Sequence, residues 1–181
     1  GSRILVQRAV YDEFLDRFEA DDGKWKAGDP FDSSTRLGPL VSKNQYERVM
    51  NYLDIAGREG RVLFGGGRPD GGDTGYYVAP TLLVDCTNQM TPVREELFGP
   101  VVVVVPFDDE DEAIAIANDS DYGLYSYVFS KDTARAWNVA RQLRSGNVGI
   151  NTLQRNHEAP FGGFKQSGVG RDGGDFGLHA Y

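Results

Sequence analysis

The sequence predicts a layered α/β protein built around a largely parallel sheet. Short apolar segments of strand length alternate along the chain with segments of helical periodicity. The longest apolar run, residues 101–107, reads VVVVVPF and has the length of one buried strand. The chain has 181 residues, of which 40% are hydrophobic and 25% charged, and this suffices for one well-buried domain. Ligand sites in such sheets gather at the carboxyl ends of the strands.

Six segments are expected to form strands, because each is short and apolar and most are bounded by turn residues. In chain order they are residues 3–7, 61–66, 79–85, 101–107, 124–130 and 147–151.

Four segments show helical periodicity, at residues 11–20, 42–60, 108–119 and 132–146. The second is the clearest, because Ser42 and Gln45 match a capping box and an apolar stripe follows. The third has acidic residues in its first turn, where the helix dipole favours them. In the fourth, Arg141 and Arg144 are expected in the last turn, and Gly146 is expected to end the helix.

Composition excludes several classes of partner. With 19 basic against 27 acidic residues, the net charge is −8, which argues against nucleic acid or an anionic membrane surface. The sequence has no apolar run of about 18 residues, so we expect no transmembrane helix. Cys86 is the only cysteine, which favours a reducing compartment and predicts a cytoplasmic protein. Its place at a strand end favours a small packing side chain over a nucleophile.

Two further features, a glycine-rich motif and a pair of histidines, are not predicted to form binding sites, because their sequence context does not fit. The segment GVGRDG, residues 168–173, matches Gly-x-Gly-x-x-Gly, but a glycine-rich loop precedes it where a dinucleotide site requires a strand. His157 and His179 are too isolated to suggest a metal pair, and we predict no metal site.

Glu95 and Glu96 stand directly before the valine-rich strand and leave two interpretations open. An ionised carboxylate at a strand end can accept hydrogen bonds from both hydroxyls of a ribose. Alternatively, the two acids are solvated residues in a short turn, and the local pattern alone favours this structural interpretation.

Four sequence blocks favour the ribose-binding interpretation over the structural one. In chain order they are TPVREELFGPVV, YGLYSYVFSKD, GNVGIN and APFGGFKQSGVGRDGG. Together they resemble the NAD(P)-dependent aldehyde dehydrogenase superfamily, and the resemblance covers essentially the whole chain. It implies a three-layer αβα fold with a largely parallel sheet, as in the catalytic domain of that family. It also implies that residues 1–181 form a single domain, a fragment of that catalytic domain.

The resemblance implies a cofactor site for NAD or NADP. Glu96 matches the position that holds the ribose next to the nicotinamide, and Phe98 matches one that packs beside the nicotinamide ring. Gln45 and Arg48 match, more loosely, positions that reach toward the cofactor, although Gln45 also has the capping-box explanation.

The resemblance also implies a substrate pocket. Asn151 and Phe161 match positions close to the aldehyde, with Phe161 as an apolar wall. The loop between them is more polar than a fatty-aldehyde tunnel requires, which favours a polar aldehyde; its polar side chains include Arg155, His157 and Glu158.

For the whole enzyme, the resemblance implies oxidation of an aldehyde to a carboxylic acid through a cysteine thiohemiacetal and thioester. The nucleophilic cysteine, the general-base glutamate and the cofactor-binding domain are expected upstream of Gly1. The isolated chain is therefore expected to be inactive, and the full-length enzyme to form a homo-oligomer. The alternatives are a non-catalytic binding or assembly module of the same fold, and a relative that forms acyl-coenzyme A.

Overall fold

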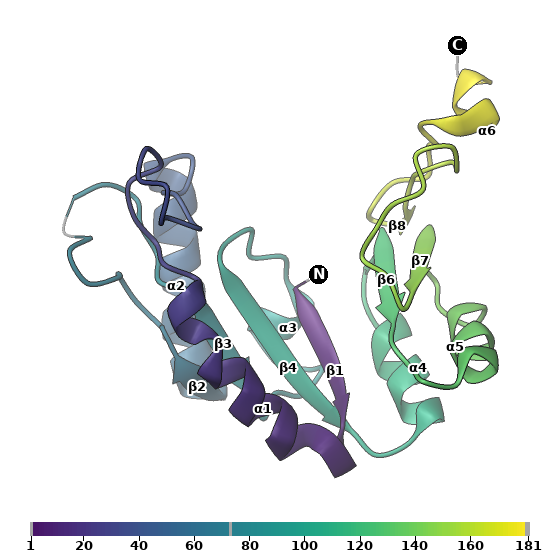
Figure 1. The fold of residues 1–181 in the computed structure, drawn as a ribbon, viewed down its shortest axis with the longest axis horizontal. Coiled ribbons are helices and arrows are strands. Elements are labelled where there is room, and N and C mark those ends of the chain that lie inside the picture. The colour runs from purple at the N-terminus through teal and green to yellow at the C-terminus, as the bar shows by residue number, and fades with distance from the viewer. Residues whose placement is uncertain (1, 73, 180–181) are drawn as a thin grey trace. The chain divides into compact units, whose positions relative to one another are not determined.

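The computed structural model describes residues 2–72 and 74–179. The chain divides into two compact units, one spanning Ser2–Asp108 and the other running from Asp109 onward (Figure 1). The expectation of one domain over residues 1–181 stays a prediction.

The first unit is built on a four-stranded sheet with the strand order β1-β4-β3-β2. The central strand β4 runs parallel to both of its neighbours, whereas β2 pairs antiparallel with β3. The four strands are β1 (Arg3–Gln7), β2 (Arg61–Phe64), β3 (Thr81–Val84) and β4 (Val101–Phe107).

Helices cover both faces of this sheet, and α1 (Tyr11–Ala20) lies in front of it in Figure 1. This helix packs in one apolar cluster with alternate strand residues, which include Val6, Leu82, Val84 and Val104. Because side chains alternate along a strand, Val103 faces the other way. There lie α2 (Lys43–Glu59) and α3 (Thr91–Arg94), behind the sheet in Figure 1. The run of valines is therefore explained by burial on both faces of a central strand.

The second unit contains two short sheets. Strands β6 (Tyr125–Val128) and β7 (Asn147–Ile150) run parallel, and β5 (Tyr122–Gly123) pairs antiparallel with β8 (Phe164–Lys165). Its helices are α4 (Glu110–Asn118), α5 (Thr133–Ala140) and α6 (Gly174–Leu178). Two short 3-10 helices belong to the first unit, at Arg8–Val10 and Asp22–Lys24.

Helix α5 ends earlier than the sequence predicts, at Ala140 and not near Gly146. A side chain from α4 explains the difference. The Asn118 amide donates to the Gln142 carbonyl at 2.8 Å, and its oxygen accepts from the Arg144 N–H at 2.7 Å. These backbone groups are bonded outside the helix, so Arg144 lies beyond it, and Arg141 is the C-cap residue; neither lies in the last turn as predicted.

Two further sequence features have structural explanations. In the GVGRDG segment, the Arg171 guanidinium donates to the carbonyls of Gly163 and Gly170, at 2.9 and 2.8 Å, and so ties the glycine-rich loop to itself. Of the helices in the described part of the chain, none is both long and apolar enough to cross a bilayer.

Candidate cofactor and aldehyde site

The loop of residues 95–100, here called the EELFGP loop, joins α3 to β4. It lies at the amino end of β4, and not at the carboxyl ends of the strands, where the parallel-sheet pattern led us to expect ligand sites. The Leu97 side chain is buried, and the Pro100 carbonyl accepts a hydrogen bond from the Thr81 N–H at 2.9 Å. The loop is therefore fixed at its base to the most buried part of the sheet.

Helix α2 holds the main chain of this loop from the side. The Gln45 side-chain amide donates to the carbonyls of Leu97 and Phe98, at 2.8 and 2.9 Å. One helical turn further on, Arg48 donates to the Glu96 carbonyl at 3.0 Å. The structure thus brings Gln45 and Arg48 to the segment that carries Glu96 and Phe98, although about fifty residues separate them in sequence.

The capping alternative for Gln45 applies to its backbone only. The Ser42 hydroxyl accepts a hydrogen bond from the Gln45 backbone N–H at 3.2 Å and so caps the helix. The Gln45 side chain is directed to the EELFGP loop, and helix capping does not account for it.

Gly99 allows the loop to lie directly on α2. A Cβ atom placed at this position would meet the side chain of Val49 at 2.9 Å, closer than real Cβ contacts allow. Val49 is fully buried in the middle of the helix, so it has little room to move away.

Phe98 has an unusual backbone. Its φ is +52°, a left-handed conformation that is rare for a bulky side chain and costs of order 1–3 kcal/mol. The two hydrogen bonds from Gln45 hold it there, and the ring is 71% exposed. A strained residue that turns an aromatic ring toward solvent gains little for folding, which marks it as a candidate for ligand contact.

The two glutamates have different surroundings. The Glu95 carboxylate accepts a hydrogen bond from the Tyr52 hydroxyl, and this bond is the main cause of the raised pKa of Tyr52. Glu96 is exposed, and its carboxylate makes no hydrogen bond or ion pair with any residue in 2–72 or 74–179. Of the pair, Glu96 is the one whose acceptor oxygens are available to a ligand with two hydroxyl donors.

Tyr52 is a participant that the sequence analysis missed. It lies seven residues after Gln45 and four after Arg48, so all three share one face of α2. The guanidinium of Arg48 also lies 5.6 Å from the centre of the Tyr52 ring. The sequence could have pointed to Tyr52 through this spacing, because it places Tyr52 on the same helix face as Gln45.

Asn151 lies in the second unit, directly after β7. Its side-chain amide donates to the Ser130 carbonyl at 2.8 Å, and its side-chain oxygen accepts from the Ser130 N–H at 2.9 Å. Its φ of +53° is a conformation that asparagine tolerates. The side chain therefore joins the carboxyl ends of β6 and β7 and sets the direction in which the following loop leaves.

Phe161 lies at the far end of that loop. Its ring centre is 6.3 Å from that of Tyr125, and the Arg155 guanidinium lies over the ring at 3.9 Å. The preceding carbonyl, of Pro160, accepts from the Asn147 side chain at 3.1 Å.

Asn151 and Phe161 therefore belong to opposite ends of β7. Phe161 packs on Tyr125, which pairs with Asn147 at the start of the strand, whereas Asn151 follows its last residue. A rise of about 3.3 Å per residue places these ends roughly 13 Å apart. The loop that joins them, residues 152–160, runs between the two predicted pocket residues.

Cys86 is buried, as the sequence suggested for a packing side chain. Burial, with a smaller contribution from the neighbouring Asp85 carboxylate, raises the pKa of its thiol from 9.0 to about 11. The thiolate is the nucleophilic form, so this side chain is poorly suited to attack a carbonyl at neutral pH.

Comparison with known proteins identifies the family. A sequence model described as "Aldehyde dehydrogenase family" matches residues 1–181. The chain belongs to the aldehyde dehydrogenase family. It is 43% identical to a putative aldehyde dehydrogenase of Staphylococcus aureus strain MSSA476, over the whole chain and 38% of that protein.

Solved structures of the family share the fold. A betaine aldehyde dehydrogenase of Staphylococcus aureus in complex with NAD+ superposes with a TM-score of 0.95 at 44% identity, over the whole chain and 37% of that protein. An aldehyde dehydrogenase of Mycobacterium tuberculosis, also complexed with NAD+, gives 0.95 at 40% identity, over 99% of this chain and 37% of that one. The α/β fold class and the family resemblance are thereby confirmed. The chain spans little more than a third of the length of these relatives.

Proposed function

We propose that this chain works as part of an NAD(P)-dependent aldehyde dehydrogenase that oxidises an aldehyde to a carboxylic acid. Within that enzyme, the chain supplies the nicotinamide-ribose side of the active site and part of the substrate funnel. The observation that carries the proposal is the pairing of an available Glu96 carboxylate with the strained, exposed Phe98, both on one anchored loop.

The residues on this loop fit a nicotinamide cofactor. Glu96 is a pure acceptor at neutral pH, as a ribose with two hydroxyl donors requires, and Phe98 offers an apolar ring face. When bound, the cofactor would supply a hydride acceptor. Gln45 and Arg48 hold the carbonyls of residues 96–98, and so fix the positions of Glu96 and Phe98. Because Glu96 and Phe98 are already held in place, the cofactor does not lose binding free energy to ordering them.

On the substrate side, we propose that Asn151 orients the loop of residues 152–160 and that Phe161 forms an apolar wall. The Asn151 amide joins two strand ends, so it acts by positioning the loop. The partners that this proposal implies are an aldehyde, the cofactor-binding domain of the same enzyme and further copies of that enzyme. A net charge of −8 fits neither a nucleic acid nor an anionic membrane partner.

A coupled assay tests the proposal. The full-length enzyme, mixed with a panel of aldehydes and with NAD or NADP, should reduce the cofactor, as followed by absorbance. Residues 1–181 alone should show no turnover, and Cys86→Ser in the full-length enzyme should leave the rate intact, because the buried thiol does not react. Cofactor reduction by the isolated chain that is lost on Cys86→Ser would contradict the proposal, as would a full-length enzyme that oxidises none of the aldehydes.

A further inference from the structure

The loop of residues 152–160 carries one cationic side chain, and its surroundings are specific. The Arg155 guanidinium lies 3.9 Å from the centre of the Phe161 ring, close enough for a cation–π contact. The side chain is exposed, and no hydrogen bond or ion pair joins it to any other residue that the structure describes. Its N–H donors thus remain available beside the ring that we propose as a wall of the aldehyde pocket.

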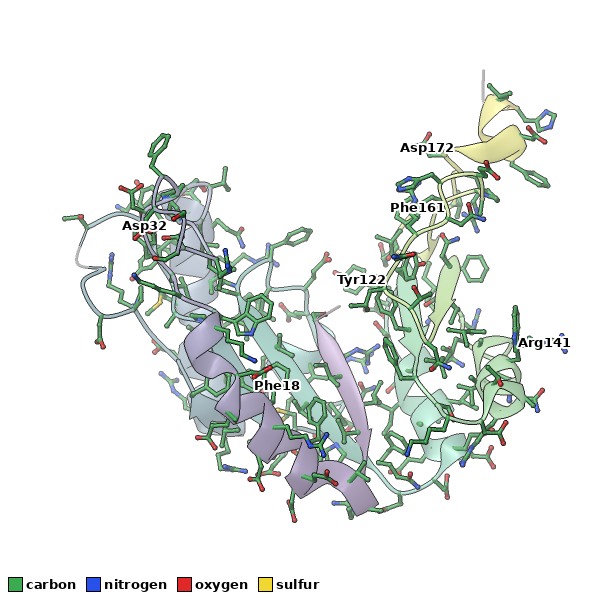
Figure 2. All side chains as sticks on the ribbon, in the orientation of Figure 1. Phe18, Asp32, Tyr122, Arg141, Phe161 and Asp172 are labelled. Atoms are coloured by element: carbon green, nitrogen blue, oxygen red, sulfur yellow. The ribbon has the colours of Figure 1, made fainter. Side chains whose placement is uncertain are left out.

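The loop that carries Arg155 is held against residues 172–174. The backbones of Phe161 and Asp172 exchange two hydrogen bonds of 2.7 Å, and Figure 2 labels both residues. A Cβ atom at Gly174 would lie 2.5 Å from the Glu158 carbonyl, so only glycine lets this backbone approach so closely. Gly173 also lies against the loop, with its Cβ position 3.9 Å from the Arg155 guanidinium.

The carboxylates nearest in sequence do not neutralise this charge. Glu158 follows three residues later, but its carboxylate lies beyond ion-pair distance from Arg155, and its backbone N–H bonds to the Asn156 side chain at 3.0 Å. The Asp172 carboxylate accepts a bond from the Gly173 N–H at 3.1 Å. The guanidinium therefore keeps its charge and its planar set of donors toward solvent.

We propose that Arg155 selects the substrate by charge, favouring aldehydes that carry a carboxylate and disfavouring cationic ones. The proposal rests on the proposed function, in which Phe161 borders the aldehyde. A guanidinium presents paired N–H donors that match a carboxylate, and charged hydrogen bonds of this kind are about twice as strong as neutral ones. Arg155 would thus act as a specificity-determining residue on the loop between Asn151 and Phe161.

The same contact explains the exclusion of cations. A quaternary ammonium group is recognised by the faces of aromatic rings. One face of Phe161 is already covered by Arg155, so a second cation on that ring would displace the guanidinium or lie close to a like charge. An uncharged aldehyde is neither attracted by the Arg155 charge nor repelled by it.

The test uses the full-length enzyme and three aldehydes of similar size: 4-oxobutanoate with a carboxylate, uncharged pentanal, and trimethylammonioacetaldehyde with a fixed positive charge. Arg155→Gln removes the charge but keeps much of the length, and Arg155→Lys keeps the charge. Arg141→Gln is the matched control, an exposed arginine on the C-terminal side of α5 (Figure 2). For each variant, kcat/KM is measured for the three aldehydes, together with the Kd for the cofactor.

We expect Arg155→Gln to lower kcat/KM for 4-oxobutanoate about tenfold or more, the loss expected for one charged hydrogen bond. The same change should raise kcat/KM for the cationic aldehyde and leave that for pentanal and the cofactor Kd almost unchanged. Arg155→Lys should keep the wild-type order of substrates, and Arg141→Gln should have no effect.

Equal changes for all three aldehydes would show that Arg155 only supports the loop, and would overturn the proposal. So would a wild-type preference for the cationic aldehyde over 4-oxobutanoate. A wild-type enzyme that oxidises no aldehyde would reject the proposed function and this proposal together. Turnover that is insensitive to the charge at position 155 would reject this proposal alone.

Discussion

Replacing Gln45 with methionine should loosen the EELFGP loop without unwinding α2. Methionine has a similar length and shape but no N–H donor, so the carbonyls of Leu97 and Phe98 both lose their partner. At about 1 kcal/mol net for each hydrogen bond, the loop loses about 2 kcal/mol of anchoring, which corresponds to a roughly 30-fold rise in its opening equilibrium. The helix cap persists, because Ser42 bonds to the backbone of residue 45.

Amide hydrogen exchange on the full-length enzyme without cofactor measures this directly. The N–H groups of Thr81 and Val101 donate to the Pro100 and Gly99 carbonyls of the loop, so their exchange should become up to roughly 30-fold faster in Gln45→Met, while exchange in the rest of α2 stays unchanged. Asn51→Ala, at an exposed position on the same helix, is the matched control and should change neither region.

Unchanged exchange at the Thr81 and Val101 amides in Gln45→Met would refute the anchoring role. Faster exchange throughout α2 would show that the substitution damages the helix, and would also contradict the reasoning. Omitting the cofactor matters, because a Gln45 that served only to contact the ligand would leave the ligand-free loop unaffected.

The remaining predictions concern stability. Gly99→Ala should destabilise the fold by about 1–3 kcal/mol in urea unfolding, because its methyl group overlaps Val49. The loss should be smaller when Gly99→Ala is introduced into a Val49→Ala background, and equal losses in the two backgrounds would count against the contact. The raised thiol pKa means that the folded state holds the Cys86 proton more tightly, so stability should fall as pH rises from about 9 to 11. Cys86→Ala should flatten that part of the pH profile, and an unchanged slope would contradict the assignment. Asn118→Ala should cost about 2 kcal/mol by removing the two hydrogen bonds beyond the end of α5, and a loss near zero would show that they do not terminate the helix.

The regular elements were predictable where the local pattern was strong. The sequence predicts a helix over residues 11–20, and α1 has the same bounds, because its apolar residues recur at helical spacing and pack on one face of the sheet. The end of α5 was not predictable in this way. It depends on Asn118, a side chain of a different helix, which periodicity within residues 132–146 does not reveal.

The candidate site could be named from the sequence by its residues, but the contacts among them could not. The family blocks pointed to Glu96 and Phe98, whereas the local pattern of the two acids alone favoured a solvated turn. Sequence reasoning did not find that Tyr52 bonds to Glu95, because that bond depends on how α2 lies against the loop. The contact between Arg155 and Phe161 is likewise tertiary, since the loop must fold back along β7 before they meet.

The central claim is that Glu96, and not Glu95, binds the cofactor. The most direct test is the Kd for NAD of the full-length enzyme carrying Glu96→Gln, measured beside Glu95→Gln. Loss of a charged hydrogen bond, worth about 1.5–3 kcal/mol, should raise the Kd of Glu96→Gln roughly tenfold to a hundredfold, with little change in Tm. Glu95→Gln should leave the Kd nearly unchanged, because its carboxylate already accepts a bond from Tyr52. A larger rise in Kd for Glu95→Gln than for Glu96→Gln would contradict the account.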